Sequence, residues 1–221
     1  MSDDSFIREV NEELRQDQMQ AIWKRYGWVL ISAAVAVVIG TAGYRAWDWY
    51  VSSQANASGD RFLQALTLSA EGKTAESAAE LDALQKDGYG SYPLLARMRA
   101  ATLLAQDGKV DEAVKAFDEV AADGSVTDAI RAMASLRAAM LLVDHGTYED
   151  VARRAEPLSA DSSELRHSAR EALGLAAWKA GRSGDALKLF QQITADKGAP
   201  ANLRQRATIM SELINGAGEG S

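Results

Sequence analysis

The chain has 221 residues, with 24 Lys plus Arg against 31 Asp plus Glu, so its formal net charge is −7 at pH 7. This acidic balance leaves no basic surface suited to nucleic acid. The chain has no cysteine, which excludes disulfides and thiolate metal sites.

Residues 1–25 form the first predicted element, a short amphipathic helix. Phe6, Val10, Leu14 and either Ile22 or Trp23 recur at helical spacing between many charged residues, and an apolar stripe on a charged helix is the amphipathic pattern. Two roles fit this segment: contact with a partner, and a solvated stub that leads into the next element.

Residues 26–45 are predicted to form a single transmembrane helix. The stretch from Tyr26 to Tyr44 has nineteen residues and no charge. At about 1.5 Å of rise per residue it reaches roughly 28 Å, the thickness of bilayer hydrocarbon. A cleaved signal peptide is the alternative, but the charged segment before the apolar stretch is too long and too acidic for one. The residues expected at the two membrane interfaces are basic or aromatic: Trp23, Lys24, Arg25, Tyr44, Arg45 and Trp47.

The basic residues near this span predict its orientation, because the cytoplasmic flank carries the excess of Lys and Arg. Four precede the span and two follow it closely: Arg8, Arg15, Lys24 and Arg25, then Arg45 and Arg61. The N-terminus is therefore expected in the cytoplasm, and residues 46–214 on the far side of the membrane.

Residues 46–214 are predicted to form a helical solenoid, because four glycines recur at a repeat-length interval. Gly72, Gly108, Gly146 and Gly181 are 36, 38 and 35 residues apart, each shortly before an Ala-rich helical pattern. Periods of this length indicate stacked repeats. Alignment on the glycines places small residues seven positions before them, and small, bulky and apolar residues after them. The residues expected to pack the helix pairs together are Ala101, Ala113, Phe117, Gly174, Ala186 and Phe190.

This order of residues resembles the tetratricopeptide repeat, whose two antiparallel helices recur about every 34 residues. The segment EALGLAAWKAGRSGDALKLFQQI is the closest match. Ser77 in the first segment and Ala155 in the third depart from the pattern, so the count is three or four pairs. Pro200 is expected to open a capping helix, and residues 215–221 to form a disordered tail. The predicted fold class is all-α: one N-terminal transmembrane helix, a solenoid of three to four helix pairs, and a C-terminal capping helix.

The whole layout resembles the YfgM-type family of bacterial inner-membrane proteins, ancillary subunits of the SecYEG translocon with a periplasmic tetratricopeptide domain. The resemblance rests on two groups of residues: Gly43, Tyr44, Arg45 and Trp47 at the membrane exit, and Tyr89, Gly90, Leu95 and Ala96 in the second repeat. It implies a single-pass inner-membrane protein whose solenoid lies in the periplasm, near the translocon exit and the chaperones that receive newly exported chains.

An enzyme is not expected. Ser163 and His167 stand four residues apart near Asp161 and could meet as nucleophile and base on one helix, but the run SADSSELRH is also an ordinary helix-capping sequence. His167 with Glu164 or Glu171 offers two metal ligands and lacks a third. The glycines are isolated repeat turns, so no phosphate-binding loop is predicted, and neither a cofactor nor a small-molecule substrate is expected.

The first helix of each pair is predicted to line a groove for partner proteins, as in tetratricopeptide repeats. Carrying over the register gives eight candidates: Met98, Thr102, Met133, Met140, Glu171, Leu175, Trp178 and Lys179. Methionine and tryptophan make an adaptable apolar surface for unfolded or nascent clients, while the alternative is that several of these side chains fill contacts between repeats. The predicted function is a non-catalytic protein-binding module, and the alternative is a structural scaffold for another cell-envelope assembly.

Overall fold

A computed structural model of the protein describes the backbone of residues 3–218 and the side chains of residues 19–20 and 23–216. Within this part the chain is helical and has no β-strand, which confirms the all-α prediction. The chain divides into two compact units, Met1–Ala57 and Ser58–Ser221.

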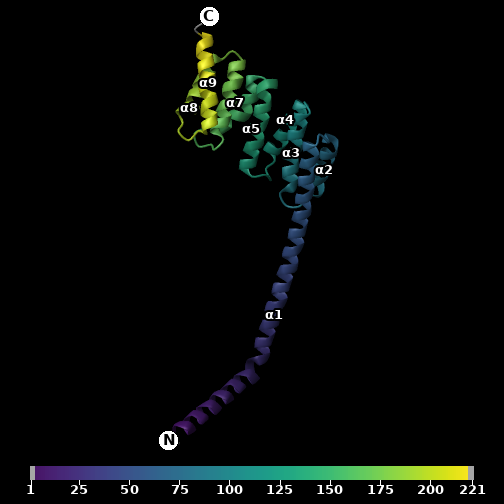
Figure 1. Cartoon of the computed structure of the whole chain (residues 1–221), viewed down its shortest axis with the longest axis vertical. Helices are drawn as coiled ribbons and strands as arrows, with labels where there is room; N and C mark the ends of the chain where they lie inside the picture. Colours follow the sequence, from purple (N-terminus) through teal and green to yellow (C-terminus); the bar gives the residue numbers. More distant parts are fainter. Residues whose placement is uncertain (1–2, 219–221) are drawn as a thin grey trace. The chain divides into compact units, whose positions relative to one another are not determined.

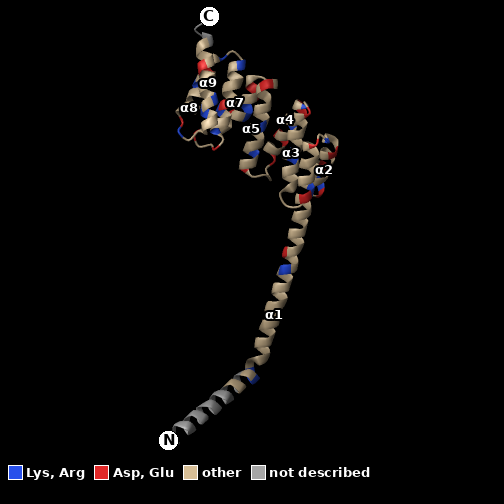
Figure 2. Ribbon diagram, in the orientation of Figure 1, with Lys and Arg blue, Asp and Glu red and all other residues tan. Residues whose placement is uncertain are grey.

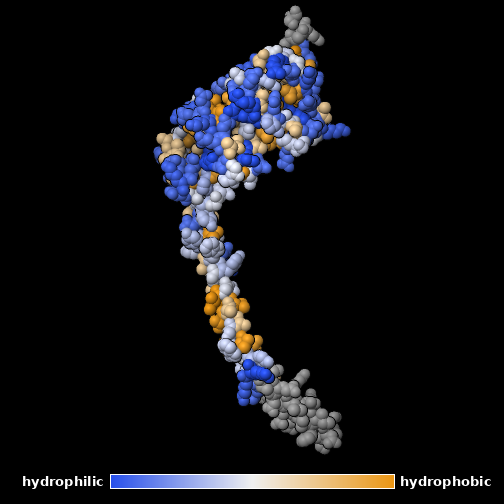
Figure 3. Space-filling model, turned by 180° about the vertical axis from the view of Figure 1, so that it is seen from behind, coloured by the Kyte–Doolittle hydropathy of each residue, from blue (hydrophilic) through white to orange (hydrophobic). Residues whose placement is uncertain are grey.

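The first unit consists of most of the helix α1 (Asp3–Ala70). From Trp23 onward, α1 is the one helix in the described part of the chain that is long and apolar enough to cross a membrane. Figure 3 shows a band of apolar residues on the visible face of this stretch of α1, and Figure 2 shows charged residues on either side of the stretch. Unlike the core helix of a soluble protein, this stretch has almost no buried surface. The six predicted interface residues, Trp23, Lys24, Arg25, Tyr44, Arg45 and Trp47, are all exposed.

The predicted amphipathic element falls mostly outside the described side chains. The backbone of α1 is helical from Asp3, but the side chains of Phe6, Val10, Leu14 and Ile22 lie outside the described residues. The apolar stripe proposed for residues 1–25 stays a prediction.

The second unit begins with the end of α1 and continues through eight further α-helices (Figure 1). From α2 onward, helices that follow one another along the chain pack together, and α5 also packs on α7 and α7 on α9. The end of α1 contributes Ala65 to a buried cluster with Leu81 and Leu84 of α2. The end of α1 pairs with α2 (Thr74–Asp87), α3 (Tyr92–Gln106) with α4 (Val110–Ala122), α5 (Asp128–His145) with α6 (Tyr148–Ala155), and α7 (Arg166–Lys179) with α8 (Ser183–Ala195). A 3-10 turn η1 (Glu156–Leu158) follows α6, and α9 (Ala201–Gly218) is the final helix.

Three of the four repeat glycines end their helix in the same way. Gly72, Gly108 and Gly181 have φ of 78°, 77° and 74°, a left-handed conformation that glycine adopts without a Cβ penalty. In the first turn, Lys73 N donates to Leu68 O at 2.9 Å, the bond that closes a Schellman motif. These turns reverse the chain between the two helices of a pair.

The third turn is built differently. Gly146 has φ of −114° and leads into Thr147, which caps α6. Thr147 Oγ1 accepts from Asp150 N at 3.2 Å, and the Asp150 carboxylate accepts from Thr147 N at 3.0 Å. This reciprocal capping box satisfies two free N–H groups of the helix, so the turn needs no left-handed residue.

The core follows the repeat register. The predicted packing residues Ala101, Ala113, Phe117, Gly174, Ala186 and Phe190 are all buried. Ser77, which departs from the pattern, is also fully buried, and its hydroxyl donates to Ala65 O at 2.8 Å. A hydroxyl fits an otherwise small, apolar position because this bond satisfies it.

The second helix of the third pair is shorter than the second helices of the other pairs. Its second helix, α6, has only eight residues and gives way to the turn η1, which contains Pro157. Ala155 stands where the second and fourth pairs have phenylalanine, and it leaves less apolar area for packing. Arg154 adds two hydrogen bonds to Asp118 of α4, at 2.8 and 2.6 Å. A bidentate ion pair of this geometry therefore ties the short helix to the preceding pair.

The final helix, α9, packs on α7 and α8. Leu203 and Ala207 are buried against the fourth pair, whereas Gln205, Thr208 and Glu212 are exposed. Ile209 and Leu213 are exposed as well, so the uncovered side of α9 mixes polar and apolar residues where a terminal repeat usually has a polar outer face. The helix runs to Gly218, four residues past the boundary predicted at 214. The remainder of the predicted tail, residues 219–221, lies outside the described residues.

Candidate binding groove

Three hollows of the second unit share residues and form one surface, here called the inner groove. One of about 440 Å³ lies between α3 and α5, the next, of about 430 Å³, reaches Ser168 of α7, and the last, of about 440 Å³, lies between α5, α7 and α9. The first two share Thr102, Met133 and Arg137, and the last two share Met140. The inner groove is lined by Leu95, Met98, Arg99, Thr102, Ala105, Phe117, Ala129, Ile130, Met133, Leu136, Arg137, Met140, Leu141, Ser168, Glu171, Leu175, Arg206, Ile209 and Met210.

Methionine is concentrated in this groove. Four of the six methionines of the chain line it: Met98, Met133, Met140 and Met210. Met133 and Met140 are 38% and 40% exposed, so both residues are open to solvent in part. Unbranched, polarisable side chains adapt to apolar partners of different shapes. The groove can therefore accept apolar side chains without one fixed fit.

The structure places six of the eight predicted groove residues in the inner groove: Met98, Thr102, Met133, Met140, Glu171 and Leu175. The other two lie elsewhere. Trp178 is 40% exposed on α7 but lines none of the three hollows. Lys179 is exposed and belongs to a separate hollow.

Glu171 lines the groove mainly as half of an ion pair. Its carboxylate is buried and accepts two hydrogen bonds from Arg206 of α9, at 2.6 and 2.8 Å. This bond raises the pKa of the Arg206 guanidinium above its ordinary value. The pair holds the capping helix against α7 and cancels the charge of both groups at this end of the groove.

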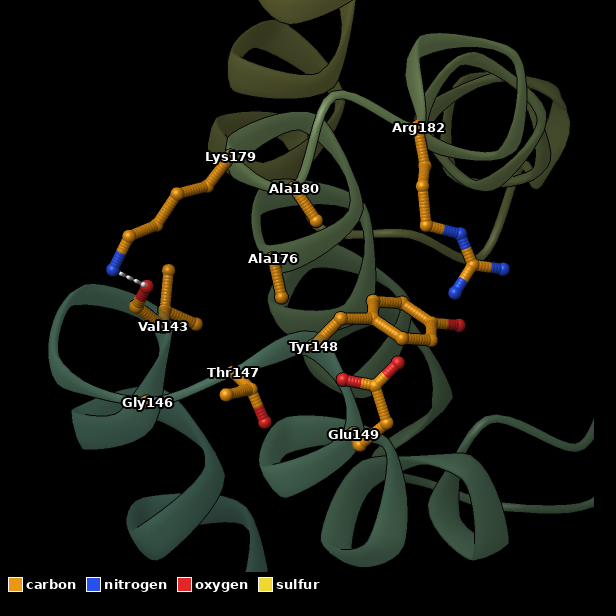
Figure 4. Close-up of a pocket in the computed structure, with 9 residues that line it drawn as sticks. All are labelled: Val143, Gly146, Thr147, Tyr148, Glu149, Ala176, Lys179, Ala180 and Arg182. Carbon is orange, nitrogen blue, oxygen red and sulfur yellow. Dashed lines mark hydrogen bonds between the residues drawn. The ribbon is translucent and has the colours of Figure 1, made fainter.

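The separate hollow lies where the α5–α6 turn meets the end of α7 (Figure 4). Lys179 points across it and donates to the carbonyls of Val143 and Asp144, at 3.1 and 2.5 Å. A cation at the last carbonyls of a helix is favourable because of the helix dipole. On the other side, the Arg182 guanidinium stacks 3.9 Å above the Tyr148 ring. The cations of this hollow thus hold the turns together, and Lys179 acts as a helix cap.

Several residues of the inner groove were not among the eight predicted from the sequence. Leu95 and Ile130 lie near the start of their helices, and Ile209 and Met210 lie on α9. A repeat signal for the last of them is present in the sequence, because Met210 follows Leu175 by 35 residues, one repeat length. If α9 is aligned as the first helix of an incomplete fifth pair, the repeat register predicts Met210 as a groove residue.

The considered catalytic pair does not assemble. His167 is buried, and its Nε2 lies 2.8 Å from Asp196 Oδ2. Ser163 Oγ accepts from Leu165 N at 3.2 Å, and Asp161 pairs with Arg170. Each of these three side chains bonds to a different partner, and together they stabilise the connections around α7.

Asp196 is the most strongly perturbed acid of this region. The hydrogen bond from His167, then those from Gly198 N and Arg166, keep the pKa of its carboxyl well below the ordinary value. The carboxylate therefore stays charged and links α7 to the α8–α9 connection.

The stacked helix pairs and the inner groove define a helical-repeat protein, a class whose concave surfaces bind other proteins. Residues 20–211 match the model of the tetratricopeptide repeat-like domain family, and the chain belongs to that family. No curated protein and no solved structure matches the chain. The family match starts before the apolar stretch of α1, so it includes that stretch together with the repeats.

Proposed function

We propose that the protein is a membrane-anchored, non-catalytic module whose inner groove holds segments of other proteins. The observation that carries this proposal is the continuity of the three hollows across α3, α5, α7 and α9. A row of apolar hollows along successive helices suits a peptide whose side chains enter them in turn. Membership of the tetratricopeptide repeat-like family supports the same class of function.

The anchor in this proposal is the predicted span at residues 26–45. An exposed apolar band on a single helix is unfavourable in water, and bilayer hydrocarbon is the environment that its length and composition fit. Four basic residues before the span against two soon after it support a cytoplasmic N-terminus. The groove then lies on the periplasmic side of a bacterial inner membrane.

The groove is proposed to act beside the Sec translocon on chains that have just crossed the membrane. The resemblance to the YfgM-type family, through Gly43, Tyr44, Arg45 and Trp47, supports this placement. The methionine lining adds a physical reason, because newly exported chains present many different apolar sequences and an adaptable surface accepts them. Periplasmic chaperones that receive the same chains are the further partners of this proposal.

Site-specific photo-crosslinking in intact membranes tests the function. A photoreactive residue at Met140, which two hollows share, should capture pulse-labelled exported chains while they emerge. The same residue at Lys115, exposed on α4 and outside the groove, is the matched control and should capture far less. Capture of one stable protein at Met140, in the same amount with and without ongoing export, would instead identify a scaffold. Equal capture at both positions would contradict the groove as the binding surface.

A further inference from the structure

Two arginines of the inner groove have no acidic partner in the described part of the chain. Arg137 of α5 is exposed and lines the first and second hollows, and no hydrogen bond or ion pair to another described residue holds it. Arg99 of α3 lines the first hollow, where its Nη2 donates to Ser69 Oγ at 2.8 Å. Its buried Nε finds no acceptor among the described residues. The only other charges on the groove, Glu171 and Arg206, cancel each other.

Positive and negative charges are also distributed unequally between the inner and the outer helices of the solenoid. The inner helices α3, α5, α7 and α9 carry nine Lys or Arg against four Asp or Glu. The outer helices α2, α4, α6 and α8 carry five Lys or Arg against eleven Asp or Glu. The inner helices therefore carry a net charge of +5 and the outer helices −6, in a chain whose net charge is −7. An anionic segment is attracted to the inner helices and repelled by the outer ones.

We infer that the inner groove selects segments in which carboxylates accompany apolar side chains, and that Arg137, assisted by Arg99, supplies the selection. This inference rests on the proposed function and adds the chemistry of the partner. Met133 lines the same two hollows as Arg137. An apolar side chain seated on Met133 therefore brings a neighbouring Asp or Glu within reach of the guanidinium. Guanidinium and carboxylate form charge-assisted, bidentate hydrogen bonds, which fix the register of the segment as well as its sign.

The test is a titration of the full chain in nanodiscs of zwitterionic lipid with matched fluorescent peptides. The peptides share the same apolar residues and carry Glu, Gln or Lys at the positions between them. The Glu peptide should bind about fivefold more tightly than the Gln peptide, the effect of one partly exposed ion pair. Added salt should narrow the difference. The Lys peptide should bind most weakly.

Variants that change one charge test whether Arg137 causes the preference for the Glu peptide. Arg137→Gln should bring the ratio of the Glu to the Gln affinity from about fivefold to near one, and an unchanged circular-dichroism melt of the variant checks that its fold is intact. Arg137→Glu should reverse the order of the Glu and Lys peptides. Lys115→Gln removes one positive charge from the outer helix α4 and is the matched control; it should leave all three affinities unchanged.

The outcomes separate this inference from the proposed function. Equal affinity for the Glu and Gln peptides would overturn the inference and leave the proposed function standing. Failure of all three peptides to bind would contradict the proposed function itself. A loss for Lys115→Gln as large as that for Arg137→Gln would assign the preference to the overall field and overturn the role of Arg137. Release of bound peptide as the chain is concentrated would identify a second copy of the chain as the occupant, which also overturns the inference.

Discussion

The contact between Phe190 and Gly174 gives the most direct test of repeat packing. Phe190 is 1% exposed, and its ring lies against the backbone of Gly174 on the partner helix α7. Replacing Phe190 with Ala removes the ring and leaves a cavity that α7 and α8 cannot fully close. Substitutions of buried phenylalanine by alanine cost about 3–5 kcal/mol of folding free energy, and we expect Phe190→Ala to fall in this range.

The glycine side of the contact makes the prediction sharper. A Cβ built on Gly174 would lie 2.9 Å from Phe190 Cζ and 3.0 Å from Cε1. Forcing atoms into a packed core costs about 1–3 kcal/mol, while Ala in place of Gly within a helix contributes about 1 kcal/mol. Gly174→Ala should therefore destabilise the parent by up to about 2 kcal/mol. In the Phe190→Ala background the ring is gone, so the same change should stabilise the protein by about 1 kcal/mol.

The assay is chemical unfolding of the full chain in detergent, followed by circular dichroism, for the parent, both single variants and the double variant. We expect a coupling energy of about 1–3 kcal/mol between the two positions, because they are in direct contact. Phe117→Ala is the matched control for the loss of a buried ring, because Ala101 occupies the position in that pair that Gly174 occupies in the fourth pair. Additive effects of the two changes, or a Phe190→Ala variant as stable as the parent, would refute the packing described for α7 and α8.

Three further predictions concern an ion pair, acid stability and topology. Glu171→Gln should lower the free energy of unfolding by about 1–2 kcal/mol, because it weakens two charge-assisted hydrogen bonds to the half-exposed Arg206; an unchanged urea midpoint would contradict this. The pKa of Asp196 is lower in the folded than in the unfolded chain, so its stabilising contribution is present above the unfolded pKa of about 3.9 and is lost as the pH falls through the folded pKa. The free energy of unfolding should therefore fall less between pH 7 and pH 3 in Asp196→Asn than in the parent. An equal fall in both proteins would show that this carboxylate is not the cause. In spheroplasts, external protease should digest the chain after Arg45, whereas protection until the membrane is ruptured would place the solenoid in the cytoplasm.

The spacing of the glycines predicted most of the fold because packing between helix pairs imposes the same residue types in every repeat. The positions seven before Gly72, Gly108 and Gly181 are small because two helices cross there, and these glycines take the left-handed conformation that a short turn requires. Gly146 has the same spacing but a different turn. Its signal was the pair Thr147 and Asp150, a capping box that performs the same reversal through side chains.

The roles of Glu171 and Lys179 were harder to predict because their partners lie on other repeats. Glu171 pairs with Arg206, 35 residues later, and Lys179 caps the helix that ends near Asp144, 35 residues earlier. A register within one repeat cannot show such partners. The separation itself is a usable signal, because equivalent positions of neighbouring repeats are close in space. Searching for opposite charges one repeat apart would also have found Arg154 with Asp118, 36 residues apart.

Positions that repeat and positions that vary have different physical tasks in this protein. The residues six before the glycines are Thr102, Met140 and Leu175, which differ in size and polarity although their neighbours one position earlier are uniformly small and buried. Packing cannot explain this variation, since the same contact between helices recurs in each pair. These side chains line the inner groove, and Leu175 also packs against the core of the fourth pair. Arg99 and Arg137, nine before their glycines, also line the groove and bring positive charge into it. If the groove holds partner segments as proposed, the variable positions of the inner helices determine which segments bind, and exchanging them between pairs should change the binding preference without changing the fold.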